Sequence, residues 1–114
     1  MRNTYRAGLF AEWLARQYLR LHGFGILESR YVTGRLTGRA EIDIIAEKRG
    51  LILFVEVKNR PNAAAGLDAI SRAQHGRLRA AAEAYLRRKQ LLCPARFDAI
   101  IVSGLKIRWL KNVV

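Results

Sequence analysis

Cysteine and histidine are scarce in this sequence, which has one cysteine and two histidines among 114 residues. With Cys93 alone, neither an intramolecular disulfide nor a zinc site built on paired cysteines can form. His22 and His75 are not spaced as metal ligands usually are. Apolar runs such as residues 51–55 fall far short of the roughly 20 residues that a membrane span requires. Charged residues interrupt the N-terminal region, which therefore lacks the features of a signal peptide. These absences predict a reduced, cytoplasmic protein without a membrane segment.

Acidic residues are also few, because 9 Asp and Glu stand against 21 Lys and Arg, giving a formal net charge of +12. Such an excess costs self-repulsion in the folded state, which a polyanionic partner would offset. Arginine carries most of this charge and can bind phosphate through two parallel hydrogen bonds. The composition therefore predicts nucleic acid as the partner, with an anionic membrane surface as the alternative.

Length and hydrophobic patterning indicate one α/β domain over residues 1–114, since a chain this short has no room for two separate cores. The patterns predict helices over residues 7–22 and 68–89, and strands over residues 25–32, 40–47, 51–58, 97–102 and 106–110. Gly23 ends the first helix, and a terminal hairpin turns across Ser103-Gly104. The second helix is a crossover, so the strands that it joins are expected to lie parallel in a mixed sheet.

Asp43 and the triplet Glu56-Val57-Lys58 are the most informative polar residues. Strand alternation places Glu41, Asp43 and Ile45 on one face of their strand, and Ile42, Ile44 and Ala46 on the other. A two-residue turn at Arg49-Gly50 would put Asp43 opposite Glu56, on the same face as Lys58. Two neighbouring carboxylates repel unless a cation lies between them, and Mg²⁺ favours one or two carboxylates together with waters and phosphate. The alternative is a structural ion pair at a sheet edge.

Glu12 lies on a narrow stripe of the first helix with two small residues, at spacings of four, three and four. That stripe is Gly8, Glu12, Ala15 and Leu19. Its small members would let the helix approach a sheet closely, which favours a partly buried Glu12 in need of a partner. A rotated helix that buries Phe10, Leu14 and Leu21 is the alternative.

The second helix has a clearer inward face, formed by Ile70, Gln74, Leu78, Ala81 and Tyr85. Gln74 is the polar member of this face. Its amide could hydrogen-bond a carboxylate or a phosphate, and a core amide bonded to backbone is equally consistent with the pattern.

Four segments along nearly the whole chain are informative together: Gly8-x-x-x-Glu12-x-x-Ala15-x-x-x-Leu19, Ala40-Glu41-Ile42-Asp43, Phe54-Val55-Glu56-Val57-Lys58-x-Arg60 and Arg96-Phe97-Asp98. In this order they resemble the bacterial YraN family, also called UPF0102. That family looks like a member of the PD-(D/E)xK nuclease superfamily, similar in its core to archaeal Holliday junction resolvases. The resemblance implies a restriction-endonuclease-like mixed β-sheet flanked by helices. It also implies that Asp43 and Glu56 bind Mg²⁺ or Mn²⁺, that Lys58 is the motif lysine and that Glu12 is the acid of the first helix.

Two positions depart from the family pattern. Ala40 stands where the family usually has glycine, and Gln74 stands where it usually has lysine. Phosphate contact at position 74 is therefore in doubt, and Arg72 or Arg77 are candidates to replace it.

The expected function is metal-dependent hydrolysis of phosphodiester bonds in DNA, branched DNA included, with Arg35, Arg39 and Arg60 following the phosphate backbone. A non-catalytic nucleic-acid-binding domain with a structural acid cluster is the alternative. A third interpretation is an adaptor or membrane-surface protein that uses Phe10, Trp13 and Leu14 as its contact, although the pattern favours these as core residues. Resolvases that cut two strands symmetrically are dimers, so a homodimer stays open, without a dimer signature in the sequence.

Overall fold

The structure, a computed structural model, describes residues 4–32, 41–60 and 72–114, except for the side chains of residue 4 and residues 72–74. Its elements are α1 (Thr4–Leu21), β1 (Gly25–Val32), β2 (Glu41–Lys48), β3 (Leu51–Asn59), α2 (Arg72–Arg88), β4 (Ala95–Ser103) and β5 (Lys106–Leu110). The predicted order of helix, three strands, helix and two strands is confirmed. The predicted start of the second helix at residue 68 lies outside the described residues. In the part of the chain described, neither helix is long and apolar enough to cross a membrane.

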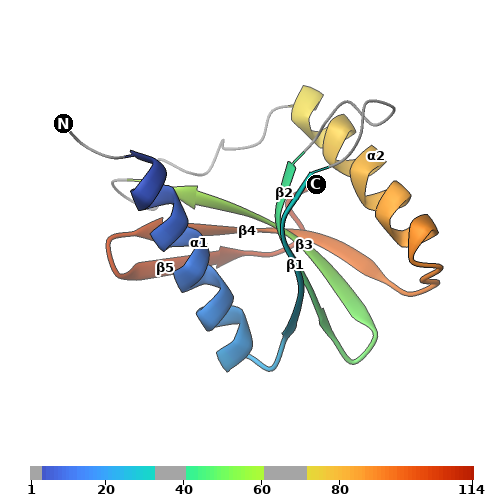
Figure 1. Ribbon diagram of the computed structural model, residues 1–114, viewed down its shortest axis with the longest axis horizontal. Coiled ribbons are helices and arrows are strands. Elements are labelled where there is room, and N and C mark those ends of the chain that lie inside the picture. The colour runs from blue at the N-terminus through green and yellow to red at the C-terminus, as the bar shows by residue number, and fades with distance from the viewer. Residues whose placement is uncertain (1–3, 33–40, 61–71) are drawn as a thin grey trace.

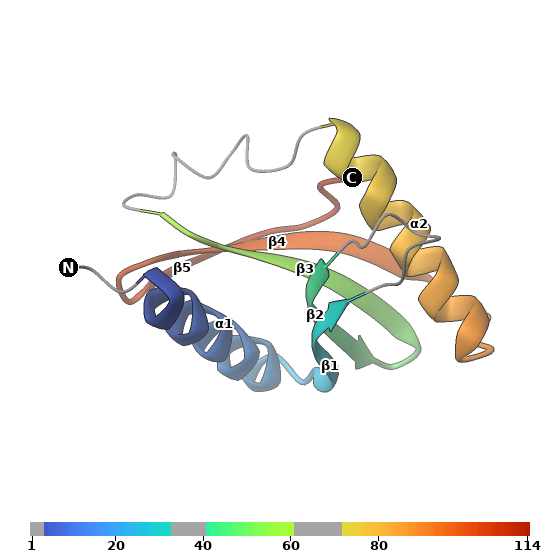
Figure 2. The same cartoon turned by 45° about the horizontal axis from the view of Figure 1, so that its top comes forward.

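The five strands form one mixed sheet in the order β1-β2-β3-β4-β5. β3 and β4 run parallel, as the crossover helix between them predicted, and the other neighbours are antiparallel. The two helices pack on opposite faces of the sheet, α1 on one and α2 on the other (Figures 1 and 2). The central strands are therefore covered on both sides, which explains why β2 and β3 are apolar over most of their length.

Each helix closes a separate hydrophobic core. The core under α1 contains Ala11, Ala15, Leu19, Phe24, Ile44, Ala46, Leu53, Val55, Ile100 and Val102. The core under α2 contains Ile42, Ile45, Ile52, Phe54, Leu78, Ala81, Ala82 and Tyr85. The inward face predicted for the second helix is therefore confirmed at Leu78, Ala81 and Tyr85, while residue 70 and the side chain of Gln74 lie outside the description.

The β2–β3 hairpin has the predicted two-residue turn. Arg49 and Gly50 have φ values of 49° and 85°, as a type I′ turn requires at both central positions. Lys48 pairs with Leu51 across the turn, and the register continues to the pair Ile44–Val55. At the β4–β5 hairpin the predicted turn is shifted by one residue, because Ser103 pairs with Lys106 and the turn residues are 104 and 105.

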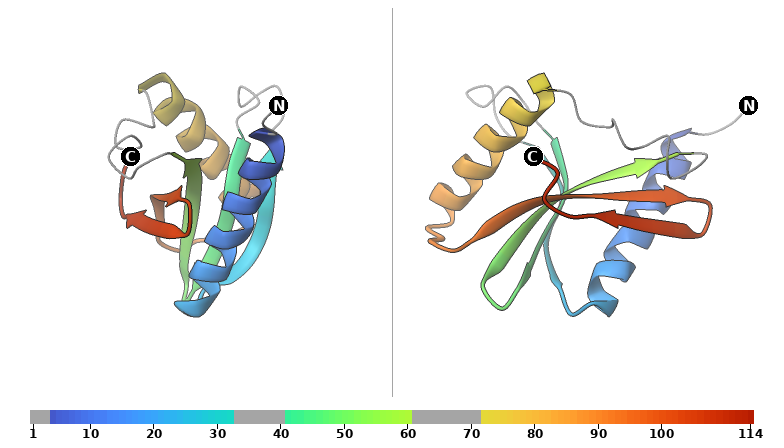
Figure 3. Two further views of the ribbon diagram at one scale, coloured as in Figure 1. Left: turned by 90° about the vertical axis from the view of Figure 1, so that its left-hand side faces the viewer. Right: turned by 180° about the vertical axis from the view of Figure 1, so that it is seen from behind.

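β2 and β3 separate beyond the pair Ile44–Val55. β2 continues to Glu41 alongside β1, whereas β3 continues to Asn59 alongside β4. Figure 3 shows the two strands diverging from their shared hairpin. We call this opening the fork, formed by residues 41–43 of β2 and residues 56–59 of β3. At the fork, β2 and β3 are no longer paired with each other, so the edges of these two central strands that face each other are left without a strand partner.

The strict alternation predicted for β2 is wrong near the fork. Ile44 packs under α1 as expected from its strand position, but Ile42, two residues away, packs under α2 with Ile45. The change of side occurs where β2 leaves β3. On the neighbouring strand β1, Arg30 lies at the same level, between the pairs Ser29–Ile44 and Tyr31–Ile42. Arg30 has a left-handed φ of 53°. Local twisting of both strands therefore reorients the residues around Asp43.

α1 turns its narrow stripe toward the sheet, so the inward interpretation of Glu12 is correct and the rotated helix is wrong. Ala15 and Leu19 are fully buried, and Glu12 is 9% exposed. Phe10 and Trp13 are about half exposed, at 48% and 49%, and their rings stack with centroids 6.1 Å apart. Their expected place in the core is therefore wrong. The small alanines bring the helix axis close to the sheet, which leaves the larger aromatic side chains of the opposite flank outside.

Candidate active site at the fork

Three acidic side chains from three different elements converge at the fork. Glu12 comes from α1, Asp43 from β2 and Glu56 from β3. Glu12 and Asp43 are buried, and the side chain of Glu56 is only 12% exposed. Asp43 and Glu56 both lie close to Glu12, and the negative charge of Glu12 raises the pKa values of both. The structure therefore brings together acids that are 13 to 44 residues apart in the sequence.

Asp43 is the most perturbed of these acids. Burial raises the pKa of its carboxyl group from 3.8 to about 7, and the negative charge of Glu56 contributes the next largest effect. Smaller repulsions come from Glu12 and from Glu41, which lies on the same strand. One interaction opposes the shift, because the backbone N–H of Val57 donates a hydrogen bond of 2.8 Å to Asp43 Oδ2. Ionised Asp43 is thus costly here unless a cation joins it.

Glu56 and Lys58 form an ion pair on β3. Lys58 Nζ lies 3.2 Å from Glu56 Oε1, and both side chains are largely buried. Burial raises the pKa of Glu56, while the charge and hydrogen bond of Lys58 lower it. The spacing of two residues along one strand places both side chains on the same side, as predicted. Lys58 therefore offsets part of the negative charge at the fork, next to the backbone of Val57.

Arg30 is a second cation at this site, and no pattern in the sequence indicated it. Its Nε donates a hydrogen bond of 2.9 Å to Glu12 Oε1. The guanidinium carbon lies 5.5 Å from the centroid of the Tyr5 ring, within the range of a cation–π interaction. The bond to Glu12 also raises the pKa of Arg30. Residues 12 and 30 belong to different elements, so their contact has no local sequence signature.

The predicted nucleic-acid contacts are only partly described. Arg60 follows β3 directly, and its Nη1 donates a hydrogen bond of 3.1 Å to the Asn59 carbonyl. Arg77 is exposed on α2. The side chains of Arg72 and Gln74 lie outside the description, as do Arg35 and Arg39 entirely. Among these residues, Arg60 is thus the one that the structure places beside the fork.

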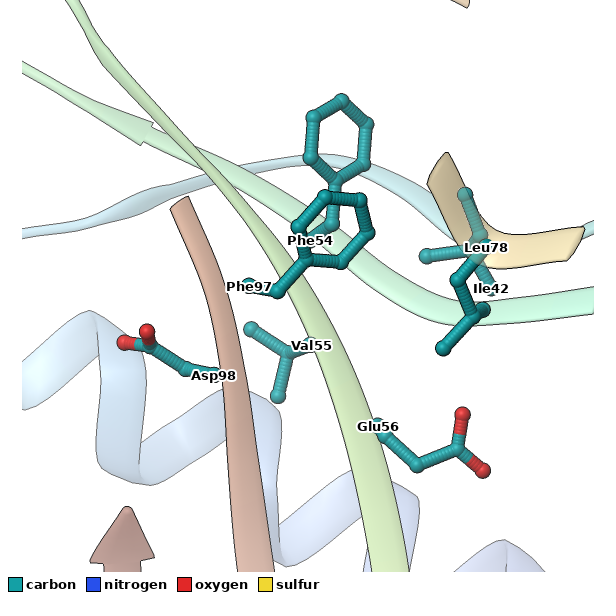
Figure 4. Close-up of a pocket in the computed structure, with 7 residues that line it drawn as sticks. All are labelled: Ile42, Phe54, Val55, Glu56, Leu78, Phe97 and Asp98. Atoms are coloured by element: carbon teal, nitrogen blue, oxygen red, sulfur yellow. The ribbon is translucent and has the colours of Figure 1, made fainter. Parts of the chain in front are cut away.

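Asp98 is a buried acid that does not belong to the cluster. A small pocket between α2 and the sheet is lined by Ile42, Phe54, Val55, Glu56, Leu78, Phe97 and Asp98 (Figure 4). The carboxylates of Glu56 and Asp98 point in different directions there, to opposite sides of the strands that carry them. Asp98 is instead bonded to Arg96 and Trp109. Its role is structural, which the segment Arg96-Phe97-Asp98 did not reveal.

The chemistry of the fork suits a divalent cation held by two carboxylates. Among the described residues, no three His, Cys, Asp or Glu side chains are arranged to hold a metal ion together. Mg²⁺ and similar ions use fewer protein ligands, often one or two carboxylates with the remaining positions filled by water and substrate phosphate. Asp43 and Glu56 provide such a pair, and burial raises the pKa of both carboxyl groups, so a cation beside them would favour their ionised forms. These two residues therefore fit the metal-binding role.

Comparisons with known sequences agree on one family. The family described as "Uncharacterised protein family UPF0102" matches residues 11–102. A UPF0102 protein of Paramagnetospirillum magneticum is 39% identical over 100 residues, covering 86% of this chain and 78% of the relative. A UPF0102 protein of Rhizobium etli is 42% identical over 104 residues, covering 90% and 82%. One from Shewanella sp. is 39% identical over 107 residues, covering 90% and 94%. On the strength of this match, which includes Glu12, Asp43, Glu56 and Lys58, the chain belongs to the UPF0102 family.

Proposed function

We propose that the fork is the active site of a metal-dependent endonuclease that hydrolyses phosphodiester bonds in DNA. The observation that carries this proposal is the buried pair Asp43 and Glu56 with Lys58 beside it, at a place where two central strands separate. The resemblance to PD-(D/E)xK nucleases supports the same conclusion, since Asp43 and the Glu56-x-Lys58 triplet occupy the positions of that motif. The five-stranded mixed sheet between two helices is consistent with such a core.

Four charged residues at the site would each have a role that follows from their surroundings. Asp43 and Glu56 would hold one Mg²⁺ or Mn²⁺ ion, with the carbonyl of Val57 as a further oxygen ligand. Such an ion would activate a water molecule and offset negative charge on the scissile phosphate. Lys58 would orient the attacking water and stabilise charge that develops on the phosphate. Glu12 would act through water, because its carboxylate is already bonded to Arg30.

The charge of the molecule supports a nucleic-acid substrate. The net charge of +12 favours binding of a polyanion at any site that is not itself strongly acidic. Arg60, at the end of β3, and the more distant arginines would contact phosphates without reading the base sequence. Branched DNA is the substrate to test first, because the core resembles that of junction resolvases.

The decisive experiment removes the lysine while leaving the acids in place. We expect Lys58→Ala to lower cleavage of branched or single-stranded DNA in Mn²⁺ by at least about a hundredfold, since a charge-stabilising group typically contributes that much. Its affinity for the same DNA should stay within about threefold, because Lys58 is one cation among 21 and binding draws on many phosphate contacts. Cleavage is followed on gels, and affinity is measured by fluorescence anisotropy.

Lys106→Ala is the matched control, since Lys106 is exposed on the edge strand β5. It removes the same charge away from the fork and should leave cleavage unchanged. Equal loss of binding and cleavage in Lys58→Ala would contradict the proposed role of the lysine. Absence of cleavage by the wild-type protein on every branched and single-stranded substrate would contradict the nuclease proposal.

A second candidate is a non-catalytic nucleic-acid-binding domain. Two ion pairs favour it, because Arg30 already neutralises Glu12 and Lys58 already neutralises Glu56. A purely structural cluster would bind DNA with the same affinity in the presence and absence of Mn²⁺. It would also show no rise in melting temperature with Mn²⁺, whereas a metal site would stabilise the folded protein.

A further inference from the structure

Arg30 of β1 has an unfavourable backbone conformation at its position beside residue 43 of the fork. Its φ is 53°, in the left-handed region that is unfavourable for residues other than glycine, asparagine or aspartate. The residue lies between two regular pairs of the β1–β2 ladder, Ser29–Ile44 and Tyr31–Ile42. It is therefore opposite Asp43. The surrounding structure must hold this conformation in place, which is typical of residues with a functional constraint.

The Arg30 side chain is fixed by two residues of α1. Its Nε donates to Glu12 Oε1 at 2.9 Å, and the Tyr5 ring lies under the guanidinium at 5.5 Å. The side chain of Glu12 is 12% exposed, whereas that of Arg30 is 39% exposed. Arg30 therefore closes the solvent side of Glu12 and keeps its own guanidinium in contact with solvent at the edge of the site.

The charges at the fork are distributed unevenly. Glu12 is paired with Arg30, and Glu56 is paired with Lys58. Asp43 receives a backbone hydrogen bond from Val57 and is paired with neither cation. Among the described residues Asp43 forms no ion pair, so a divalent ion would meet Asp43 with Glu56 as its neighbour. Glu12 is an acid that a second ion would use, and a guanidinium already occupies it.

We propose that Arg30 is a positioning residue that withholds Glu12 from metal coordination and provides the second positive charge of a site for one divalent ion. The proposal rests on the function proposed above and specifies how the first-helix acid takes part. Arg30 and a divalent ion compete for the same carboxylate, so removal of Arg30 releases Glu12 toward the ion. A residue that merely stabilised the fold would have no such effect on metal affinity.

The test is a calorimetric titration of Mn²⁺ into three proteins. They are the wild type, Arg30→Asn and the double variant Arg30→Asn/Glu12→Gln. Asparagine tolerates the left-handed conformation, so Arg30→Asn removes the charge and leaves the backbone at position 30 undisturbed. We expect one ion per wild-type chain and an affinity about tenfold higher in Arg30→Asn, the smallest effect that an adjacent unit charge usually has on an ionisable group. The double variant should lose that gain.

Arg79→Asn is the control for loss of one positive charge, because Arg79 is exposed on α2. Its Mn²⁺ affinity should stay within about twofold of the wild type, since exposed charges are largely screened at physiological salt. Equal or weaker binding by Arg30→Asn would overturn the proposal while keeping the metal site. A gain that persists in the double variant would also overturn it. If neither wild type nor Arg30→Asn binds Mn²⁺, then the metal site and the role of Arg30 both fail.

Discussion

Among the acids of the site, Asp43 has the environment that most disfavours the ionised carboxylate. It is 8% exposed, lies near Glu56 and accepts a hydrogen bond from the backbone N–H of Val57. Its pKa is raised to about 7, so at neutral pH it is partly protonated. A bound cation would favour the ionised form. Metal binding at this residue, as proposed, would therefore be coupled to proton release.

The raised pKa of Asp43 predicts that the free protein loses stability as pH rises from about 4 to about 7. In that range the folded state retains a proton that the unfolded state has released, since the pKa is 3.8 in the unfolded reference and about 7 in the fold. Stability that depends on bound protons in the folded state decreases as they dissociate. The free energy of unfolding from urea titrations at pH 4.5 and pH 8 measures the change.

Asp43→Asn should remove this part of the pH dependence, because asparagine does not titrate. Glu83→Gln is the matched control, since Glu83 is exposed on α2, and it should keep the wild-type slope. Mn²⁺ at pH 8 should restore stability to the wild type and have no such effect on Asp43→Asn. The same slope in wild type and Asp43→Asn would show that this carboxyl group is not the cause.

The elements at the C-terminal end of the chain are joined by another acid, Asp98 of β4. It is 1% exposed and accepts hydrogen bonds from Arg96 Nε and Nη2 and from Trp109 Nε1, each 2.8 Å long. The backbone N–H of Asn112 donates a further bond of 3.0 Å. One side chain thus connects β4, β5 and the residues that follow β5. It also keeps the edge of the sheet next to the parallel pair β3–β4 in place.

Asp98→Ala should destabilise the protein by about 2–4 kcal/mol, because Trp109 Nε1 and the Asn112 N–H lose their acceptor at about 1–3 kcal/mol for each unsatisfied buried group, whereas Arg96 is partly exposed. The free energy of unfolding measured in guanidinium chloride tests this. Hydrogen exchange at the Asn112 amide should accelerate as well, because that N–H loses its acceptor. Glu83→Ala, an exposed change on α2, should cost less than about 0.5 kcal/mol. A loss of less than 1 kcal/mol in Asp98→Ala would show that the network contributes little.

The helices and strands were predictable because their signals are local. Gly23, with a φ of 90°, ends α1 where expected, and the two-residue turn at Arg49-Gly50 sets the register of the β2–β3 hairpin. The regular alternation of β2 failed at Ile42 because the strand changes partners there. Strand alternation assumes a continuous flat ladder, whereas β2 leaves β3 at the fork and stays with β1.

At the scale of the whole molecule, the sequence carries a large excess of positive charge, with a formal net charge of +12. The 21 Lys and Arg residues outnumber the 9 Asp and Glu residues, and several of those acids gather at one place. A polyanion would therefore be attracted by the molecule as a whole. Its phosphates would be repelled by the acids of the fork until a divalent ion is bound there. The overall positive charge would thus attract the polyanion, and the proposed metal ion would let a phosphate approach the acids of the fork.

The overall charge predicts that DNA binding depends steeply on salt. If the protein contacts about six phosphates, its affinity for DNA should fall about a thousandfold between 50 and 200 mM salt. Fluorescence anisotropy at several salt concentrations gives the slope. The slope should be the same for wild type and Lys58→Ala within about one phosphate contact. An affinity that does not change with salt would contradict nucleic acid as the partner and favour a protein partner that binds through the exposed Phe10 and Trp13.

Sequence patterns alone were enough to predict the order of elements, the parallel placement of β3 and β4, the register of the β2–β3 hairpin and the proximity of Asp43 to Glu56. These features follow from periodicity, turn residues and connection lengths, which act over a few residues. Three features required the packed fold: α1 turns Glu12 toward the sheet, Arg30 binds Glu12, and Asp98 links β4 to β5. Those contacts join residues brought together by packing of whole elements, and the free energy that selects them comes from the buried surfaces of helix and sheet together.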